Sequence, residues 1–144
     1  ALDVLVAFND YAYKEHRSEV REGGFILLDP SVSPDESDVA RHVLAIPFDE
    51  LAKKTGESRA ANMVIMGALA HLVNLPVDIF KQFVAKRFAG RDAVISANHM
   101  ALDLGYEQTK NESAIADLSS TPDKPSYEQI FIKGNGIEAN EVCR

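Results

Sequence analysis

The sequence has 144 residues but only one cysteine and no tryptophan. With Cys143 alone, the chain cannot by itself form an internal disulfide, an iron–sulfur site or a multi-cysteine zinc site. This cysteine usage fits a reducing setting, so we expect a cytoplasmic protein. Basic residues are also scarce, 15 against 22 acidic ones, and the net charge of −7 repels phosphate backbones. We therefore expect no nucleic-acid partner.

A long hydrophobic run is missing as well. The longest apolar stretch, residues 63–73, is interrupted by His71 and is too short to span a bilayer. The first residues lack the basic start, apolar stretch and cleavage site of a signal peptide, so we expect no membrane partner. The remaining composition, with 46% hydrophobic and 26% charged residues, is typical of a folded globular domain.

The first third of the chain alternates between strand and helix signals. Residues 2–8 form an almost continuous apolar run, which is typical of a strand buried on both faces. Because a domain rarely opens on its central strand, we expect that the N-terminal part of this domain is missing. Asp10 is a suitable cap for the next helix, and Gly23-Gly24 would end it. In chain order we expect a strand at 2–8, a helix at 11–22, a strand at 25–29, an acidic loop with at most one helical turn at 31–41, and a strand at 42–46.

Helical periodicity dominates after Pro47. Ser58 is a good cap for a helix over 59–74, which is apolar nearly all round and should be buried. The small residues Gly67, Ala68 and Ala70 would let a neighbouring backbone come close. We expect four more helices: one over 48–54, one from Pro76 to just before Gly90, one that begins at Asp92, and a short one over 111–118. In the second of these, either Phe83 or Val84 faces inward. We predict an α/β fold: a Rossmann-like parallel sheet with a helical C-terminal half.

The last 26 residues differ in composition. Residues 119–126 are small and polar with two prolines, which is typical of a linker. Residues 127–133 alternate as a new strand does, and Gly134-Asn135-Gly136 would turn it toward a helix. We therefore predict a domain over 1–118, a linker over 119–126, and the first strand of a second domain within 127–144.

Motifs with known chemistry are few. The four histidines lie 26 to 29 residues apart, so none has the spacing of helical metal ligands, and no G-x-S-x-G motif is present. His71 on the apolar helix is more often a core histidine than a ligand. The basic residues Lys81, Lys86, Arg87 and Arg91 favour a solvated outer face over an anion or partner patch. We expect no catalytic residue and no metal ligand in this chain.

Two features point to ligand binding. Asn9 and Asp29 follow parallel strands, and α/β sheets bind ligands at the carboxyl ends of their strands. Residues 134–139, Gly-Asn-Gly-Ile-Glu-Ala, formally match the G-x-G-x-x-A dinucleotide fingerprint. One hypothesis is therefore a nucleotide-binding Rossmann domain of an oxidoreductase. Another is a non-catalytic dimerisation module that uses the small residues of the apolar helix.

Several segments resemble the gamma domain of 2-oxoacid:ferredoxin oxidoreductases. The most specific is Ala61-Asn62-Met63-Val64-Ile65-Met66-Gly67-Ala68-Leu69-Ala70, followed by Leu75-Pro76, Phe88, and Ala101-Leu102-Asp103-Leu104-Gly105-Tyr106-Glu107. Residues 3–9 and 22–29 look like the family's strand, helix, glycine turn and strand. The resemblance covers residues 1 to about 107. The family's glycine-rich loop after its first strand is not in this sequence, so the resemblance places it upstream of Ala1.

In fused alpha subunits of that family, the gamma domain precedes a linker and a thiamine-pyrimidine-type domain, whose opening looks like residues 130–135. The resemblance thus implies part of the alpha subunit of a 2-oxoglutarate or pyruvate oxidoreductase that forms acyl-CoA and passes electrons to ferredoxin. Thiamine diphosphate, Mg²⁺ and an iron–sulfur cluster would be held mainly by a thiamine-binding beta subunit. This chain would pack subunits and help to place coenzyme A, and its candidate cofactor-binding residues are Asn9, Arg59 and Asn62.

Overall fold

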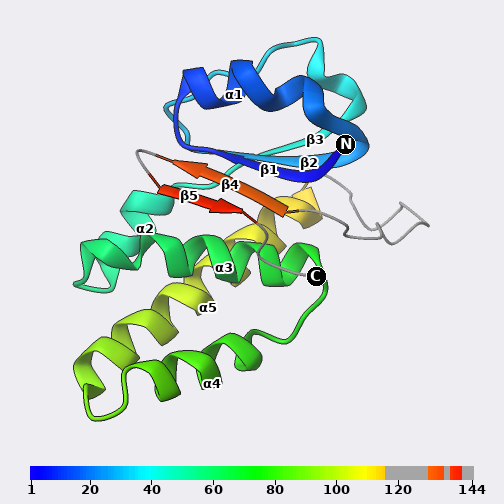
Figure 1. Cartoon of the computed structure of the whole chain (residues 1–144). Helices are drawn as coiled ribbons and strands as arrows, with labels where there is room; N and C mark the ends of the chain where they lie inside the picture. Colours follow the sequence, from blue (N-terminus) through cyan, green and yellow to red (C-terminus); the bar gives the residue numbers. More distant parts are fainter. Residues whose placement is uncertain (116–129, 135–136, 141–144) are drawn as a thin grey trace. The chain divides into compact units, whose positions relative to one another are not determined.

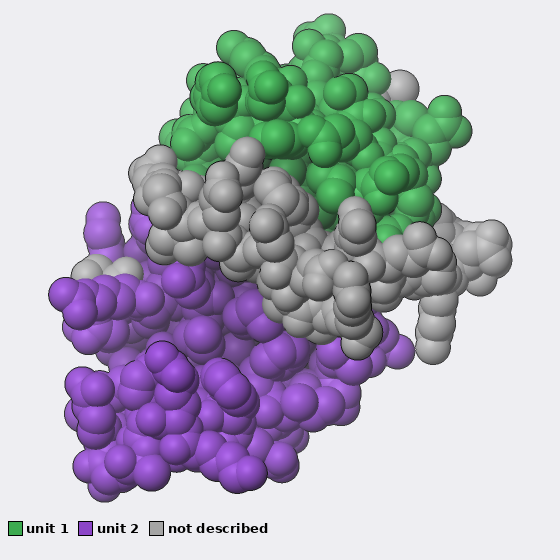
Figure 2. Space-filling model, viewed as in Figure 1, with its two compact units in different colours: residues 1–46, 116–144 green, residues 47–115 purple. Residues whose placement is uncertain are grey.

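The computed structural model describes residues 1–115, 130–134 and 137–140. The chain divides into two compact units, shown in different colours in Figure 2. Unit 1 combines residues 1–46 with residues 116–144, and unit 2 comprises residues 47–115. Unit 1 holds the sheet, and unit 2 is helical.

Unit 1 is built on a five-stranded sheet of order β3-β2-β1-β4-β5 (Figure 1). The central strand β1 (Leu2–Ala7) is buried at every position, as its continuous apolar sequence predicts. It pairs in parallel with β2 (Val20–Leu28) on one side and with β4 (Ile130–Gly134) on the other. The edge strand β3 (His42–Ala45) pairs in parallel with β2, so the predicted parallel α/β sheet is confirmed.

The connection between β1 and β2 differs from the prediction. Helix α1 (Asp10–His16) is followed by a 3₁₀ turn, η1 (Arg17–Glu19), and β2 already begins at Val20. The expected helix over 11–22 is therefore too long. Asn9, not Asp10, is its N-cap: the Asn9 Oδ1 accepts a hydrogen bond from the backbone N–H of Ala12 at 2.8 Å.

Gly23 and Gly24 lie inside β2 rather than at the end of a helix. The pairing of β1 with β2 shifts between Leu2↔Val20 and Val4↔Phe25, so β2 has three more residues than β1 in this interval. Gly23 has a φ of +73°, and a Cβ on Gly24 would lie 2.9 Å from the carbonyl oxygen of Asp3. The two glycines therefore permit a bulge, because other residues would be strained or would clash there.

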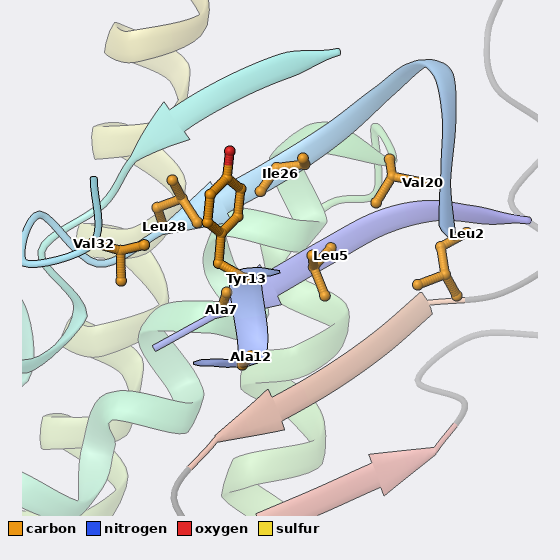
Figure 3. Close-up of a cluster of buried hydrophobic side chains, with 9 residues drawn as sticks. All are labelled: Leu2, Leu5, Ala7, Ala12, Tyr13, Val20, Ile26, Leu28 and Val32. Carbon is orange, nitrogen blue, oxygen red and sulfur yellow. The ribbon is translucent and has the colours of Figure 1, made fainter. Parts of the chain in front are cut away.

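The core of unit 1 lies between the sheet and α1. In Figure 3 the ring of Tyr13 from α1 stands beside Leu28 and Ile26 of β2. The other members of this buried cluster are Leu2, Leu5, Ala7, Ala12, Val20 and Val32. The loop after β2 contains one 3₁₀ turn, η2 (Asp38–Ala40), which confirms the expected single turn in this acidic segment.

The tail contains a hairpin instead of the expected strand and helix. β5 (Ile137–Asn140) pairs antiparallel with β4, so the predicted helix after Gly134 is wrong. Asn-Gly is a strong hairpin signal, although Asn135 and Gly136 lie outside the described residues. β4 also belongs to the same sheet as β1, so the compact units divide the chain differently from the predicted domains. The predicted linker at 119–126 lies outside the described residues as well.

Unit 2 consists of α2 (Phe48–Lys54), the 3₁₀ turn η3 (Ser58–Ala60), α3 (Ala61–Leu72), α4 (Val77–Arg87) and α5 (Asp92–Ile115). The helix expected to begin at residue 59 starts two residues later, so its N-cap position is Ala60 instead of Ser58. Glu57 caps η3 by accepting from the N–H of Arg59. The short helix expected at 111–118 is not separate, because α5 continues to Ile115. The predicted burial of α3 is confirmed.

The backbones of α3 and α5 touch where both helices carry glycine. A Cβ on Gly67 would lie 2.9 Å from the carbonyl carbon of Leu102 and closer still to its oxygen. A Cβ on Gly105 would lie 2.8 Å from the carbonyl carbon of Val64. The close approach predicted at the small residues is therefore present, and its partner is α5 of the same unit.

Candidate functional site

The carboxyl edge of the sheet is the candidate ligand edge of unit 1. The strand order reverses beside β1, because β2 and β3 lie on one side of it and β4 on the other. In open α/β sheets, ligands bind outside the carboxyl ends of the strands at such a switch point. Asn9 lies at this edge, two residues after the end of β1, and Asp29 directly follows β2, as predicted.

Both side chains also hold the local backbone. The Asn9 carbonyl caps α1, and the Asp29 carboxylate accepts a hydrogen bond from the backbone N–H of Ser31 at 2.9 Å. These bonds are typical of a helix cap and an Asx turn, which satisfy backbone donors where strands end. Asn9 therefore has a demonstrated structural role.

Arg59 and Asn62 lie close together at the start of α3 in unit 2, and both are exposed. The N-cap residue Ala60 offers no side-chain acceptor to the first turn of α3. The Arg59 guanidinium has no ion-pair partner among the described residues. The structure thus places a cation and an amide at one helix start, whereas Asn9 belongs to the other unit.

A buried polar cluster in unit 1 escaped the sequence analysis. The Tyr13 hydroxyl donates a hydrogen bond to the buried Asp38 carboxylate and accepts one from the backbone N–H of Asp35 at 2.7 Å. Arg17 bridges Asp38 and Asp35 at 3.1 and 3.3 Å. Arg41 reaches the other oxygen of Asp38 at 3.3 Å. The cluster ties the acidic loop to α1, and its sequence signal is one aromatic residue facing inward from α1.

The protonation states in this cluster indicate a structural role. Burial and the hydrogen bond to Asp38 raise the pKa of Tyr13 above its usual value. Hydrogen bonds from the Ser37 hydroxyl and backbone lower the pKa of Asp35. Tyr13 therefore stays a neutral phenol that can donate to Asp38, and Asp35 stays an anion that can pair with Arg17.

The four histidines do not converge. His16 contacts Glu19 at 2.7 Å, and the Nε2 of His99 lies 2.9 Å from the carbonyl oxygen of Lys81. The ring of His42 packs against that of Phe25 on the neighbouring strand, and the ring of His71 meets Tyr106 edge-on. Burial lowers the pKa of both His42 and His71. Within the described ranges, no group of three His, Cys, Asp or Glu side chains is placed to hold a metal ion.

Comparison with known proteins identifies the family. Residues 1–108 match the family "Pyruvate ferredoxin/flavodoxin oxidoreductase". The chain belongs to this family. It is 33% identical over 107 residues to ketoisovalerate oxidoreductase subunit VorA of Methanothermobacter marburgensis, covering 73% of this chain and 22% of VorA. It is also 32% identical over 117 residues to 2-oxoglutarate synthase subunit KorC of Methanocaldococcus jannaschii, covering 75% of this chain and 59% of KorC.

A solved member of the family has the same fold. The 2-oxoglutarate:ferredoxin oxidoreductase from Magnetococcus marinus, solved with 2-oxoglutarate, coenzyme A and succinyl-CoA bound, matches with a TM-score of 0.71 and 26% identity. The match covers 91% of this chain and 24% of that chain. The chain therefore spans about a quarter or less of the VorA and Magnetococcus polypeptides.

No helix within the described part is long and apolar enough to cross a membrane.

Proposed function

We propose that this chain is part of a thiamine-diphosphate-dependent 2-oxoacid:ferredoxin oxidoreductase, which oxidatively decarboxylates a 2-oxoacid to acyl-CoA. The family match over residues 1–108 is the observation that carries this proposal. The names of the relatives support it, because each is a subunit of an oxidoreductase of a 2-oxoacid. The substrate we favour is 2-oxoglutarate, with pyruvate as the alternative.

The described residues do not fit the redox cofactors of such an enzyme. They contain no metal-holding cluster, and the only cysteine, Cys143, lies outside them. Iron–sulfur clusters need several thiolates, and a Mg²⁺ that binds a diphosphate needs oxygen ligands held together. We therefore place thiamine diphosphate, Mg²⁺ and the cluster on a thiamine-binding beta subunit, with ferredoxin as the electron acceptor. We infer no chemical step on this chain.

Coenzyme A is the reactant for which the described residues offer suitable groups. The exposed guanidinium of Arg59 and the amide of Asn62 stand in the first residues of η3 and α3, and the N-cap residue of α3, Ala60, has no side-chain acceptor for the first turn. Arginine binds phosphate oxygens in a fork of two hydrogen bonds, which matches the phosphates of coenzyme A. We place Asn9 at the second candidate contact, on the carboxyl edge of the sheet.

We further propose that the chain belongs to a fused alpha subunit. The Magnetococcus match covers 91% of this chain, a larger share than residues 1–108, so it includes part of the tail. In this arrangement 1–118 is the gamma domain, 119–126 the linker, and 127–144 the start of the thiamine-pyrimidine-type domain. This division assigns β1 and β4 to different domains, although the two strands pair in one sheet.

The alternative interpretations lose their basis in the structure. The motif at 134–139 leads into β5, an antiparallel strand, whereas a dinucleotide fingerprint needs a helix whose N-terminus faces the pyrophosphate. Gly67, which motivated a dimerisation surface, is covered by α5. Neither observation supports a second function.

The test is to purify the full-length protein from its native host and to assay reduction of methyl viologen. We expect reduction that requires both a 2-oxoacid and coenzyme A, and a copurifying polypeptide that binds thiamine diphosphate. Comparison of 2-oxoglutarate, pyruvate and 2-oxoisovalerate identifies the substrate. Absence of 2-oxoacid-dependent reduction in a preparation that retains its cofactors would refute the proposal.

The coenzyme A contact has its own test. Arg59→Gln should raise the KM for coenzyme A roughly tenfold, the effect of losing about 1.4 kcal/mol of binding, and leave the KM for the 2-oxoacid unchanged. Lys53→Gln on α2, another exposed cation of unit 2, is the matched control and should change neither constant. An unchanged KM for coenzyme A in Arg59→Gln removes this residue from the site.

A further inference from the structure

Helix α4 carries apolar side chains on a face that unit 2 leaves uncovered. Helix α4 packs against α5, as Figure 1 shows, and Val84 is the buried residue of α4. Ile79 and Phe83 lie one turn apart on another face, with 52% and 61% of their surface exposed. Residues four apart on a helix are neighbours, so these two side chains form one apolar patch rather than scattered exposures.

Two cations of α4 adjoin this patch, and a third follows the turn after the helix. Lys86 and Arg87 follow Phe83 by three and four residues and therefore share its face, and Arg91 lies just past the end of α4. The Cζ atoms of Arg87 and Arg91 lie 5.8 and 5.9 Å from the centroid of the Phe88 ring. Stacking on a ring orients a guanidinium and leaves its N–H donors available at the edge.

These cations differ from their neighbour Lys81. Lys81 forms an ion pair with Asp103 at 2.8 Å and is thereby neutralised within the unit. Lys86, Arg87 and Arg91 have no carboxylate partner among the described residues. A chain with a net charge of −7 thus presents, on one helix, a local surface of positive charge next to exposed apolar atoms.

We infer that the α4 face, defined as Ile79, Phe83, Lys86, Arg87 and Arg91, docks another protein that presents carboxylates around an apolar pocket. An aromatic anchor beside arginines is typical of the energetic centre of protein interfaces. Charge complementarity selects the occupant: the three unpaired cations need carboxylates, and Phe83 needs a pocket. A nucleic acid offers an extended polyanion, which the rest of this acidic chain repels. The α4 face shares no residue with the proposed coenzyme A contacts Asn9, Arg59 and Asn62.

The experiment uses the full-length protein as purified with its copurifying polypeptides. The photo-crosslinking amino acid benzoylphenylalanine replaces Phe83, and the crosslinked peptides are mapped by mass spectrometry. We expect a crosslink to a carboxylate-rich peptide of a different polypeptide. Arg87→Gln/Arg91→Gln should weaken this association roughly tenfold, and exchanging the mapped carboxylates for lysines should restore binding to Arg87→Glu/Arg91→Glu.

The control is Lys53→Gln/Lys54→Gln, which removes two exposed cations from the last turn of α2 and so matches the helix-end electrostatics. It should leave the crosslink and the affinity unchanged, and circular dichroism should show equal folding of both double variants. The inference is overturned if the crosslinks go only to this chain, to a second copy of it, to nucleic acid or to lipid. It is also overturned if no crosslink forms, or if both double variants bind the partner with equal affinity. Methyl viologen reduction is measured separately, so failure of the docking surface is distinguishable from failure of the proposed function.

Discussion

Replacing Gly67 by alanine tests how closely α3 and α5 must approach. The added methyl group would lie 2.9 Å from the carbonyl carbon of Leu102, and this neighbour is backbone, which no side-chain rotation can move. The two helices must separate, which loosens the packing of the buried Val64 and Leu102. Overpacking costs about 3 kcal/mol at the upper end of its usual range, and alanine returns about 1 kcal/mol of helix propensity. We expect a net loss of about 2 kcal/mol.

The assay is thermal and urea unfolding of the full-length protein, followed by circular dichroism at 222 nm. A loss of about 2 kcal/mol should lower the Tm of the transition that unfolds this domain by roughly 4–8 °C. Gly105→Ala should act similarly, and the double variant should lose less than the sum, because one separation of the helices relieves both clashes. Ser96→Ala, exposed on α5, is the control and should stay within about 0.5 kcal/mol. A Gly67→Ala protein as stable as the wild type would refute the reasoning.

Two further predictions concern unit 1. Tyr13→Phe should cost about 1–3 kcal/mol in urea unfolding, because it removes a donor to the buried Asp38 carboxylate, whereas Tyr11→Phe on the exposed side of α1 should cost nearly nothing. An equal effect of both changes would show that the cluster does not hold the loop. His42 has a pKa lowered by burial, so the folded state favours its neutral form, and its contribution to stability is lost as the pH falls below the ordinary value of 6.5. His42→Phe should therefore make the unfolding free energy depend less steeply on pH below 6.5, and the dependence due to His71 should remain. An unchanged slope of unfolding free energy against pH would contradict this.

Local sequence signals predicted the elements whose burial follows a regular pattern. The strand at 2–8 and the helix at 48–54 were recognised because continuous apolar runs and helical periodicity are properties of neighbouring residues. Two helix starts shifted by one or two residues, because capping is decided by local contacts: Asn9 caps α1 in place of Asp10, and Glu57 caps the 3₁₀ turn that precedes α3.

The errors lie where distant pairing decides the conformation. Gly23-Gly24 has the composition of a helix end, but the register of β2 against β1 makes it a bulge. Residues 137–140 form a strand only because β4 is available for pairing. Asn9, Arg59 and Asn62 could be placed on elements from the sequence, and their ligand-binding role stays a prediction.

The order of apolar and polar residues by itself determined the parallel sheet, the buried helix α3 and the family resemblance, because each depends on a repeating local pattern. Only the tertiary structure decided which of the adjacent residues Phe83 and Val84 is buried, since both suit a helical stripe and packing against α5 selects one. The same holds for Gly67 and Gly105, whose small size indicates a close contact but not its partner. The buried Tyr13–Asp38 pair, 25 residues apart, likewise exists only because the fold brings its members together.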